Sequence, residues 1–119
     1  ITQGRASYSH MLAFSRGVRP IPGRATADVL PDAGEMVWSK ATGVLACVDA
    51  CTFVATHTTT RTIVDPFCGY GTVLAVANAL GLDAIGVDLS TRKCRKARGI
   101  TYDLATRSLS WSAAASEDA

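Results

Sequence analysis

The sequence predicts an α/β fold built around a parallel βαβ unit that occupies residues 61–108 of the 119. Two short runs rich in β-branched and apolar residues, 62–65 and 84–88, are typical of buried strands. A glycine-rich turn and an apolar, helix-forming stretch from Val73 to Leu80 lie between them. Two strands joined through a helix form a parallel pair with a right-handed crossover. A chain of this length has room for one domain at most, so we expect residues 1–119 to form a single domain or part of one.

The region before this unit predicts a strand, a long loop and a helix. Residues 11–14 are a short apolar run between polar residues, which indicates a strand. Residues 17–34 contain three of the four prolines and are longer than an ordinary connection, so residues 1–34 are expected to hold a strand plus a long loop. Over residues 35–60, apolar side chains recur at near-helical spacing from Met36 to about Thr56. Asp32 or Gly34 is the expected cap of this helix.

The region after the second strand predicts a further helix. Ser90 is a suitable N-cap, and the helix is expected to run from Thr91 to about Ser108. Gly81 is the expected C-terminal cap of the preceding helix. Residues 109–119 are expected to form a frayed tail.

Composition and charge exclude several classes of protein. Apolar residues make up 48% of the chain and charged residues 18%, which is ordinary for a globular domain. The net charge of +2 is too small to indicate a nucleic-acid partner on its own. No apolar run reaches the roughly 20 residues that a membrane helix needs, and no leader peptide opens the chain, so we expect a cytoplasmic protein.

The four cysteines do not predict a metal site. Cys47 and Cys51 are four residues apart and share a face of the expected helix, but no second pair of His or Cys residues completes a tetrahedral set. Two small side chains in a helix core is the favoured interpretation. Cys68 is either a nucleophile or, as we favour, a loop residue that contributes its backbone N–H.

The segment from Asp65 to Thr72 carries the chemistry. A strand ends, the chain turns on Gly69 and Gly71, and a helix begins, so backbone N–H groups point into the crevice beyond the strand. Asp88 follows at the end of the next strand, about 20 residues on, the spacing at which an acid reaches ribose hydroxyls. A nucleotide cofactor is therefore expected at this edge, with Leu89 beside the adenine.

Two features favour S-adenosylmethionine over a dinucleotide. The dinucleotide fingerprint needs a third glycine where this chain has Leu74. The acid at the start of the loop, Asp65, would repel a pyrophosphate but attract the ammonium of a methionine moiety.

The run Asp65-Pro-Phe-Cys-Gly-Tyr-Gly-Thr resembles the D-P-F-x-G-x-G-T motif of class I methyltransferases that modify exocyclic amino groups of nucleic-acid bases. Residues 81–90 resemble the second-strand motif of the same family, and the likeness covers roughly residues 61–100. It implies a Rossmann-like methyltransferase fold, incomplete in this chain, that transfers a methyl group from S-adenosylmethionine to DNA or RNA. The cofactor-binding residues it implies are Asp65, Pro66, Phe67, Cys68, Gly69, Gly71, Thr72, Asp88 and Leu89.

The order of segments resembles a circularly permuted group of these enzymes, in which the catalytic motif precedes the cofactor motif. Residues 9–16 then correspond to the strand after the catalytic motif, and residues 35–38, which begin with Glu35, fall where the methionine-side binding segment lies. No D-P-P-Y or similar motif occurs in residues 1–119, so the catalytic residues are unassigned and are expected upstream of Ile1.

Several alternatives stay open from the sequence alone. The chain is also compatible with a cofactor-binding module without activity, or with a dinucleotide-dependent oxidoreductase domain. Phe67 packs either over the cofactor or under the loop. The densest charge run is either a phosphate-contacting patch or a solvated helix face; it comprises Arg92, Lys93, Arg95, Lys96 and Arg98.

Overall fold

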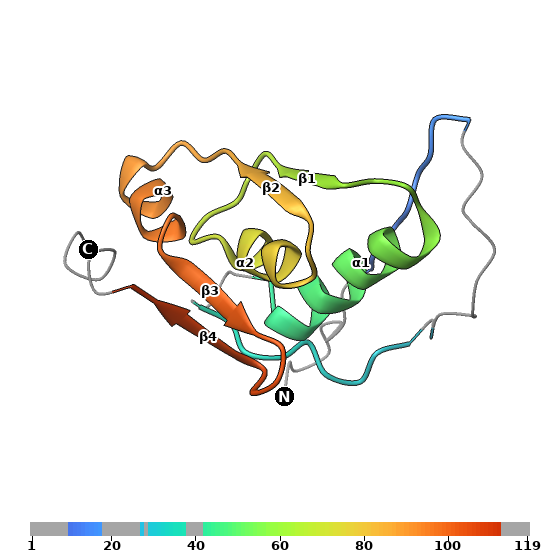
Figure 1. Ribbon diagram of the computed structural model, residues 1–119, viewed down its shortest axis with the longest axis horizontal. Helices are drawn as coiled ribbons and strands as arrows, with labels where there is room; N and C mark the ends of the chain where they lie inside the picture. Colours follow the sequence, from blue (N-terminus) through green and yellow to red (C-terminus); the bar gives the residue numbers. More distant parts are fainter. Residues whose placement is uncertain (1–9, 18–26, 28, 38–41, 113–119) are drawn as a thin grey trace, which may run out of the picture.

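The structure, a computed structural model, describes residues 10–17, 27, 29–37 and 42–112 (Figure 1). Seven elements follow one another along the described part of the chain. They are α1 (Val44–His57), β1 (Thr62–Asp65), α2 (Thr72–Ala79), β2 (Asp83–Gly86), α3 (Thr91–Ala97), β3 (Ile100–Asp103) and β4 (Ser108–Trp111).

The predicted βαβ unit is confirmed. Strands β1 and β2 pair in parallel, with Thr62 opposite Asp83 and Asp65 opposite Gly86. Helix α2 connects them, and β2 begins one residue earlier and ends two residues earlier than expected. The pairing continues past the strand ends, because the N–H of Val87 donates to the carbonyl of Asp65 at 2.9 Å. The chain is therefore a mixed α/β protein whose parallel sheet is compatible with part of a methyltransferase fold.

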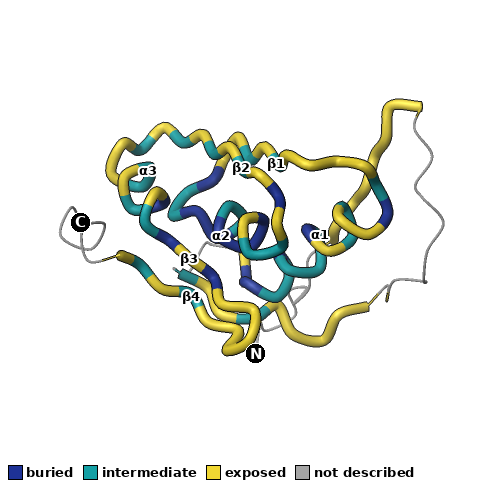
Figure 2. Tube along the Cα trace, in the orientation of Figure 1, coloured by how far each residue is buried: buried dark blue, intermediate teal, exposed yellow. Residues whose placement is uncertain are grey.

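Helix α2 is the centre of the molecule. It lies between the parallel pair on one side and α1 with β3 on the other, and Figure 2 shows most of it buried. Val76 and Ala77 are fully enclosed. The core combines side chains from α1, α2 and β3, with one from the α2–β2 turn: Val44, Cys47, Cys51, Ala75, Val76, Ala77, Leu82, Ile100 and Tyr102.

Helix α1 begins later than the sequence predicts. Its first residue is Val44, so the described residues 36 and 37 lie outside it, and residues 38–41 fall outside the described part of the chain. Gly43 occupies the N-cap position, so the expected cap at Asp32 or Gly34 is wrong. The carbonyls of Ala33 and Glu35 accept the N–H groups of Ala46 and Val44 instead. A folded-back segment thus satisfies the helix start without a side-chain cap.

The expected helix from Thr91 to Ser108 is wrong after Ala97. The chain turns at Gly99 and enters an antiparallel hairpin, in which Ile100 pairs with Trp111. Alternate residues of β3 are buried, which places Ile100 and Tyr102 in the core. The hairpin turn is held by Oδ1 of Asp103, which accepts the N–H of Ala105 at 2.8 Å. Burial of two large side chains outweighs the helix propensity of the run.

The apolar run at residues 11–14 is not a strand, so this expectation is wrong as well. Met11, Leu12 and Phe14 are 58%, 74% and 90% exposed, and no strand pairs with them within the described residues. Strand formation depends on packing against neighbours, and this exposed run has no such neighbour in the described part of the chain, so its apolar composition alone does not produce a strand. The long loop is described only at residues 17, 27 and 29–34, which contain no helix or strand. The expected tail begins within β4, and residues 113–119 lie outside the described part.

One face of the parallel sheet is uncovered, contrary to the expectation of buried strands. Val64 and Ile85 stand opposite each other and are 60% and 54% exposed, whereas Ile63 and Ala84 face the core.

No helix in the described part of the chain is long and apolar enough to cross a bilayer.

Candidate functional site

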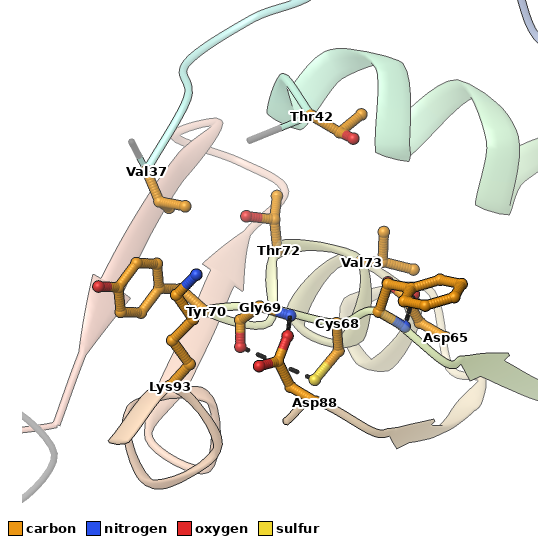
Figure 3. A pocket seen from close by; sticks show the side chains of 11 residues that line it. Val37, Thr42, Asp65, Cys68, Gly69, Tyr70, Thr72, Val73, Asp88 and Lys93 are labelled. Carbon is orange, nitrogen blue, oxygen red and sulfur yellow. Dashed lines mark hydrogen bonds between the residues drawn. The ribbon is translucent and has the colours of Figure 1, made fainter. Parts of the chain in front are cut away.

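A hollow of about 160 Å³ lies where β1 and β2 end and α2 begins (Figure 3). The loop from β1 to α2 forms its floor with Asp88, and Val37 and Thr42 lie across from Asp88. The lining residues are Val37, Thr42, Asp65, Phe67, Cys68, Gly69, Tyr70, Thr72, Val73, Asp88 and Lys93. This is the position at which open parallel sheets bind their ligands.

Asp88 is fixed by two backbone hydrogen bonds. Its Oδ1 accepts the N–H of Ser90 at 2.8 Å, and its Oδ2 accepts the N–H of Gly69 at 3.0 Å. The Ser90 N–H is the main cause that lowers the pKa of the Asp88 carboxyl; burial opposes it, and the Gly69 N–H and the Lys93 ammonium lower the pKa further. The carboxylate is therefore ionised near neutral pH and held in one orientation.

Asp65 ends β1 and begins the loop. Its Oδ1 accepts the N–H of Phe67 at 3.0 Å, a turn that bends the chain away from the strand. Its carbonyl accepts the N–H of Val87, and the N–H of Cys68 returns to the carbonyl of Val87 at 2.9 Å. These bonds attach the loop to both strand ends, so the half-buried Asp65 carboxylate is held at the rim of the hollow.

Gly71 is required by two independent constraints. Its φ of +93° is in the left-handed region, which side-chain-bearing residues rarely adopt. A Cβ at this position would also lie 2.8 Å from the Cβ of Ala97 and 3.1 Å from Cγ2 of Ile100. The glycine therefore lets α3 and β3 approach the start of α2, where Thr72 is buried. At Gly69, by contrast, a Cβ would meet nothing within 4 Å.

Leu74, in place of a third loop glycine, packs against a glycine on the neighbouring strand. A Cβ on Gly86 would lie 2.5 Å from Cδ1 of Leu74 and 2.8 Å from Sγ of Cys68. Helix α2 and strand β2 therefore approach closely because the strand has the small residue, Gly86, opposite the large residue of the helix, Leu74. This is the reverse of the arrangement in the dinucleotide fingerprint.

The Cys68 thiol is buried, and the backbone N–H of Cys68 donates to the carbonyl of Val87. Burial is the main cause that raises its pKa, and the neighbouring Cys94, Asp65 and Asp88 raise it further. A raised pKa keeps the thiol neutral, which disfavours a nucleophilic role. Its backbone N–H is contributed to the pairing of the loop with the end of the second strand, because it donates to the carbonyl of Val87.

The structure brings together six of the ten residues predicted to bind the cofactor. Asp65, Phe67, Cys68, Gly69, Thr72 and Asp88 line the hollow. Pro66 and Gly71 belong to the same loop but are not part of the lining. Phe67 is 86% exposed, so its ring does not pack under the loop, and Leu89 is fully exposed. Glu35 is exposed, and its backbone carbonyl accepts the N–H of Val44 at the start of α1. Two residues later, Val37 lines the hollow.

Five residues of the lining were not among the binding residues predicted from the sequence. They are Val37, Thr42, Tyr70, Val73 and Lys93. Tyr70 stands between the two loop glycines, and Lys93 lies three residues after the helix cap Ser90. These positions in the sequence could have indicated that both residues belong to the site. Val37 lies in the segment 35–38 that the resemblance placed at the methionine side, whereas Thr42 is brought to the site only by the tertiary fold.

The described residues contain no group of three or more His, Cys, Asp or Glu side chains able to hold a metal ion. Cys47 and Cys51 are free thiols within the core. Burial, followed by the neighbouring Cys51 and Asp65, raises the pKa of Cys47 to about 12. Both cysteines therefore act as small apolar side chains.

Comparison with known proteins gives one match. Residues 47–99, somewhat less than half of the chain, match the N6_N4_Mtase family model, described as DNA methylase. No curated protein and no solved structure matches significantly. The matched segment contains the glycine loop, Asp65 and Asp88. The match supports assignment of this segment to an amino-group DNA methyltransferase family.

Proposed function

We propose that the hollow binds S-adenosylmethionine and that the chain serves methyl transfer to an amino nitrogen of a DNA base. The cofactor supplies a methyl group on a sulfonium, which is a good leaving group and needs alignment more than acid–base help. Asp65 would hold the methionine ammonium, Gly69 would let the ligand approach the backbone, and Asp88 would accept hydrogen bonds from the ribose.

The observation that carries this proposal is the charge of the hollow. Among the described residues that line it are two carboxylates, Asp65 and Asp88, and one ammonium, Lys93, so this part of the lining carries a net negative charge. A negative site attracts the ammonium and sulfonium of S-adenosylmethionine and repels the pyrophosphate of a dinucleotide. The packing of Leu74 against Gly86 also differs from the dinucleotide pattern.

The donors and acceptors present fit a nucleoside. Each oxygen of Asp88 accepts one backbone N–H and retains a lone pair for a ribose hydroxyl. The hollow of about 160 Å³ is smaller than the roughly 300 Å³ at which ligand pockets begin. It fits part of the cofactor, and the remainder would lie over the exposed loop beside Phe67. The DNA substrate follows from the family match of residues 47–99.

The experiment that tests the cofactor is calorimetric titration of the chain with S-adenosylmethionine, its demethylated product and NADH. The variants are Asp88→Ala and a matched control, Asp83→Ala, which removes an exposed acid from the opposite end of the same strand. We expect the first two ligands to bind the unchanged chain and Asp83→Ala, and binding to Asp88→Ala to be at least about tenfold weaker.

Preferential binding of NADH would replace the proposal with a dinucleotide-dependent activity. Equal binding to all three forms of the chain would place the ligand away from Asp88. Absence of binding to a folded sample would contradict cofactor binding by this chain.

A further inference from the structure

The basic residues of the chain are unevenly distributed. Five of the 12 Lys and Arg residues fall within residues 92–98, and no Asp or Glu occurs between Ser90 and Ile100. The rest of the chain carries seven basic and ten acidic side chains, so it is net negative. The small overall charge of +2 therefore hides a strongly positive segment on a negative background.

Helix α3 places three of these cations on one face. Arg92, Arg95 and Lys96 are spaced i, i+3 and i+4, which aligns them along one side of a helix. We call these three residues the basic face. Arg92 and Arg95 are exposed, and Ala97 on the opposite side is buried.

The basic face works against the stability of its own helix. Like charges at these spacings repel each other and destabilise a helix. The first turn of α3 contains no acidic residue, so the helix dipole is not complemented there. Arg95 and Lys96 lie in the last turn of α3, where cations complement the helix dipole, but Arg92 lies in the first turn and has no such benefit. A negatively charged partner explains all three cations together.

An aromatic contact links the basic face to the hollow. The ammonium nitrogens of Lys93 and Lys96 each lie 5.6 Å from the centre of the Tyr70 ring, within the range of cation–π attraction. Tyr70 and Lys93 both line the hollow, and Figure 3 shows them side by side at its edge. A partner on the basic face would therefore lie immediately beside the proposed cofactor.

We propose that the basic face binds the sugar–phosphate backbone of duplex DNA and holds the duplex beside the hollow. The proposal rests on the proposed function, because it names where the DNA substrate is held. Arg92 and Lys96 are about 6 Å apart along the helix axis, and duplex DNA carries a charge about every 1.7 Å, so several phosphates lie within reach. A target base must leave the stack to reach an enclosed site, and a fixed backbone nearby provides the register for that step.

The test is the salt dependence of binding to a fluorescent DNA duplex, measured by anisotropy on the full chain. The variant is Arg92→Gln/Arg95→Gln. The matched control, Arg16→Gln/Arg61→Gln, removes the same charge from two exposed arginines elsewhere. We expect the slope of log K against log salt to become shallower by about 2 in the first variant and affinity to fall roughly tenfold or more at 0.1 M salt. The DNA affinity of the control should stay within about twofold of that of the unchanged chain, because arginines away from the basic face contribute only weak non-specific attraction.

Equal losses in the two variants, or no binding of DNA by the unchanged chain, would overturn the basic face as a docking site. Tighter binding of an RNA duplex of the same length would overturn the assignment to DNA. Titration with S-adenosylhomocysteine separates this proposal from the proposed function, because neither Arg92 nor Arg95 lines the hollow. Loss of DNA binding in Arg92→Gln/Arg95→Gln with cofactor binding retained supports the docking site. If the unchanged chain binds DNA through these arginines but no cofactor, only the proposed function fails.

Discussion

The backbone N–H of Gly69 donates to Oδ2 of Asp88 at 3.0 Å, which joins the glycine loop to an acid 19 residues further along the chain. The same carboxylate also accepts the N–H of Ser90, the cap of α3. One side chain therefore holds the loop, the end of β2 and the start of α3 in register. The hollow is organised by the protein's own hydrogen bonds, which lowers the ordering cost of binding a ligand.

Ligand binding should depend on pH through Asp88. Its folded-state pKa lies below the ordinary value of about 3.9, so its contribution is present above that value and is lost as the pH falls through the lowered pKa. We expect the affinity for S-adenosylhomocysteine to be constant from about pH 7 to about pH 5 and to decrease once the pH is below about 4. Calorimetry across this range measures it.

The control for this pH dependence is Asp88→Asn, whose neutral amide does not titrate. Its affinity should be weaker at pH 7, and the acid-induced loss should be smaller than in the unchanged chain. An equal loss at low pH in both forms would assign the effect to another group.

A substitution at Gly71 should destabilise the fold more than one at Gly81. Both glycines have positive φ, +93° and +80°, so alanine at either position costs about 1–2 kcal/mol of backbone strain. Only at Gly71 would the new Cβ collide, at 2.8 Å from Ala97. We expect Gly71→Ala to lower the free energy of unfolding by about 1–3 kcal/mol more than Gly81→Ala.

Urea unfolding of the two variants measures this difference. Equal destabilisation would show that α3 does not lie as close to the loop as described. Because Gly81 faces open space, the comparison separates the contact with Ala97 from the backbone strain that both substitutions share.

The sequence was sufficient to predict the parts of the fold that depend on local signals. Glycines at 69 and 71 and β-branched residues at 62–64 predicted the turn and strand that the structure contains. The hairpin after α3 was missed because the helix-forming Arg, Lys and Ala residues of 92–98 were extended past Gly99, into a stretch whose Ile, Thr and Tyr residues favour a strand. The alternation that buries Ile100 and Tyr102 was present in the sequence, but only the core they enter gives it weight.

The composition of the site was predictable where it depends on the loop and not where it depends on tertiary contacts. Asp65 and Asp88 were found from their spacing around the glycines and line one hollow. The hydrogen bond between Gly69 and Asp88 was not foreseen, because it requires the loop and the end of β2 to meet in space. Val37 lies in the segment 35–38 that the resemblance placed at the methionine side, but the folding back of this segment onto the start of α1 was not foreseen.

Leu74 and Gly86 should be energetically coupled. A Cβ on Gly86 would lie 2.5 Å from Cδ1 of Leu74, so Gly86→Ala forces the leucine to move and should cost about 1–3 kcal/mol. In a Leu74→Ala background that clash is absent, and the same substitution should cost about 1 kcal/mol less. Part of the cost remains, because Sγ of Cys68 would still lie 2.8 Å away.

A double-mutant cycle from chemical unfolding measures this coupling. Additive effects would contradict the contact between helix and strand. Gly86→Ala combined with Ala79→Gly, a substitution elsewhere on α2, is the control, because Gly86 has no close contact with that residue and the two effects should add.

The four free thiols should react with iodoacetamide in an order set by burial. Cys94 is half-buried, whereas Cys47, Cys51 and Cys68 are buried, and burial raises the pKa of each of these three. The thiolate is the reactive form, and with a pKa of about 12 Cys47 has almost none near pH 8. We expect Cys94 to be alkylated first and Cys47 last, as followed by peptide mass spectrometry. In urea all four should react at similar rates, and alkylation of Cys47 as fast as Cys94 in the folded chain would contradict its place in the core.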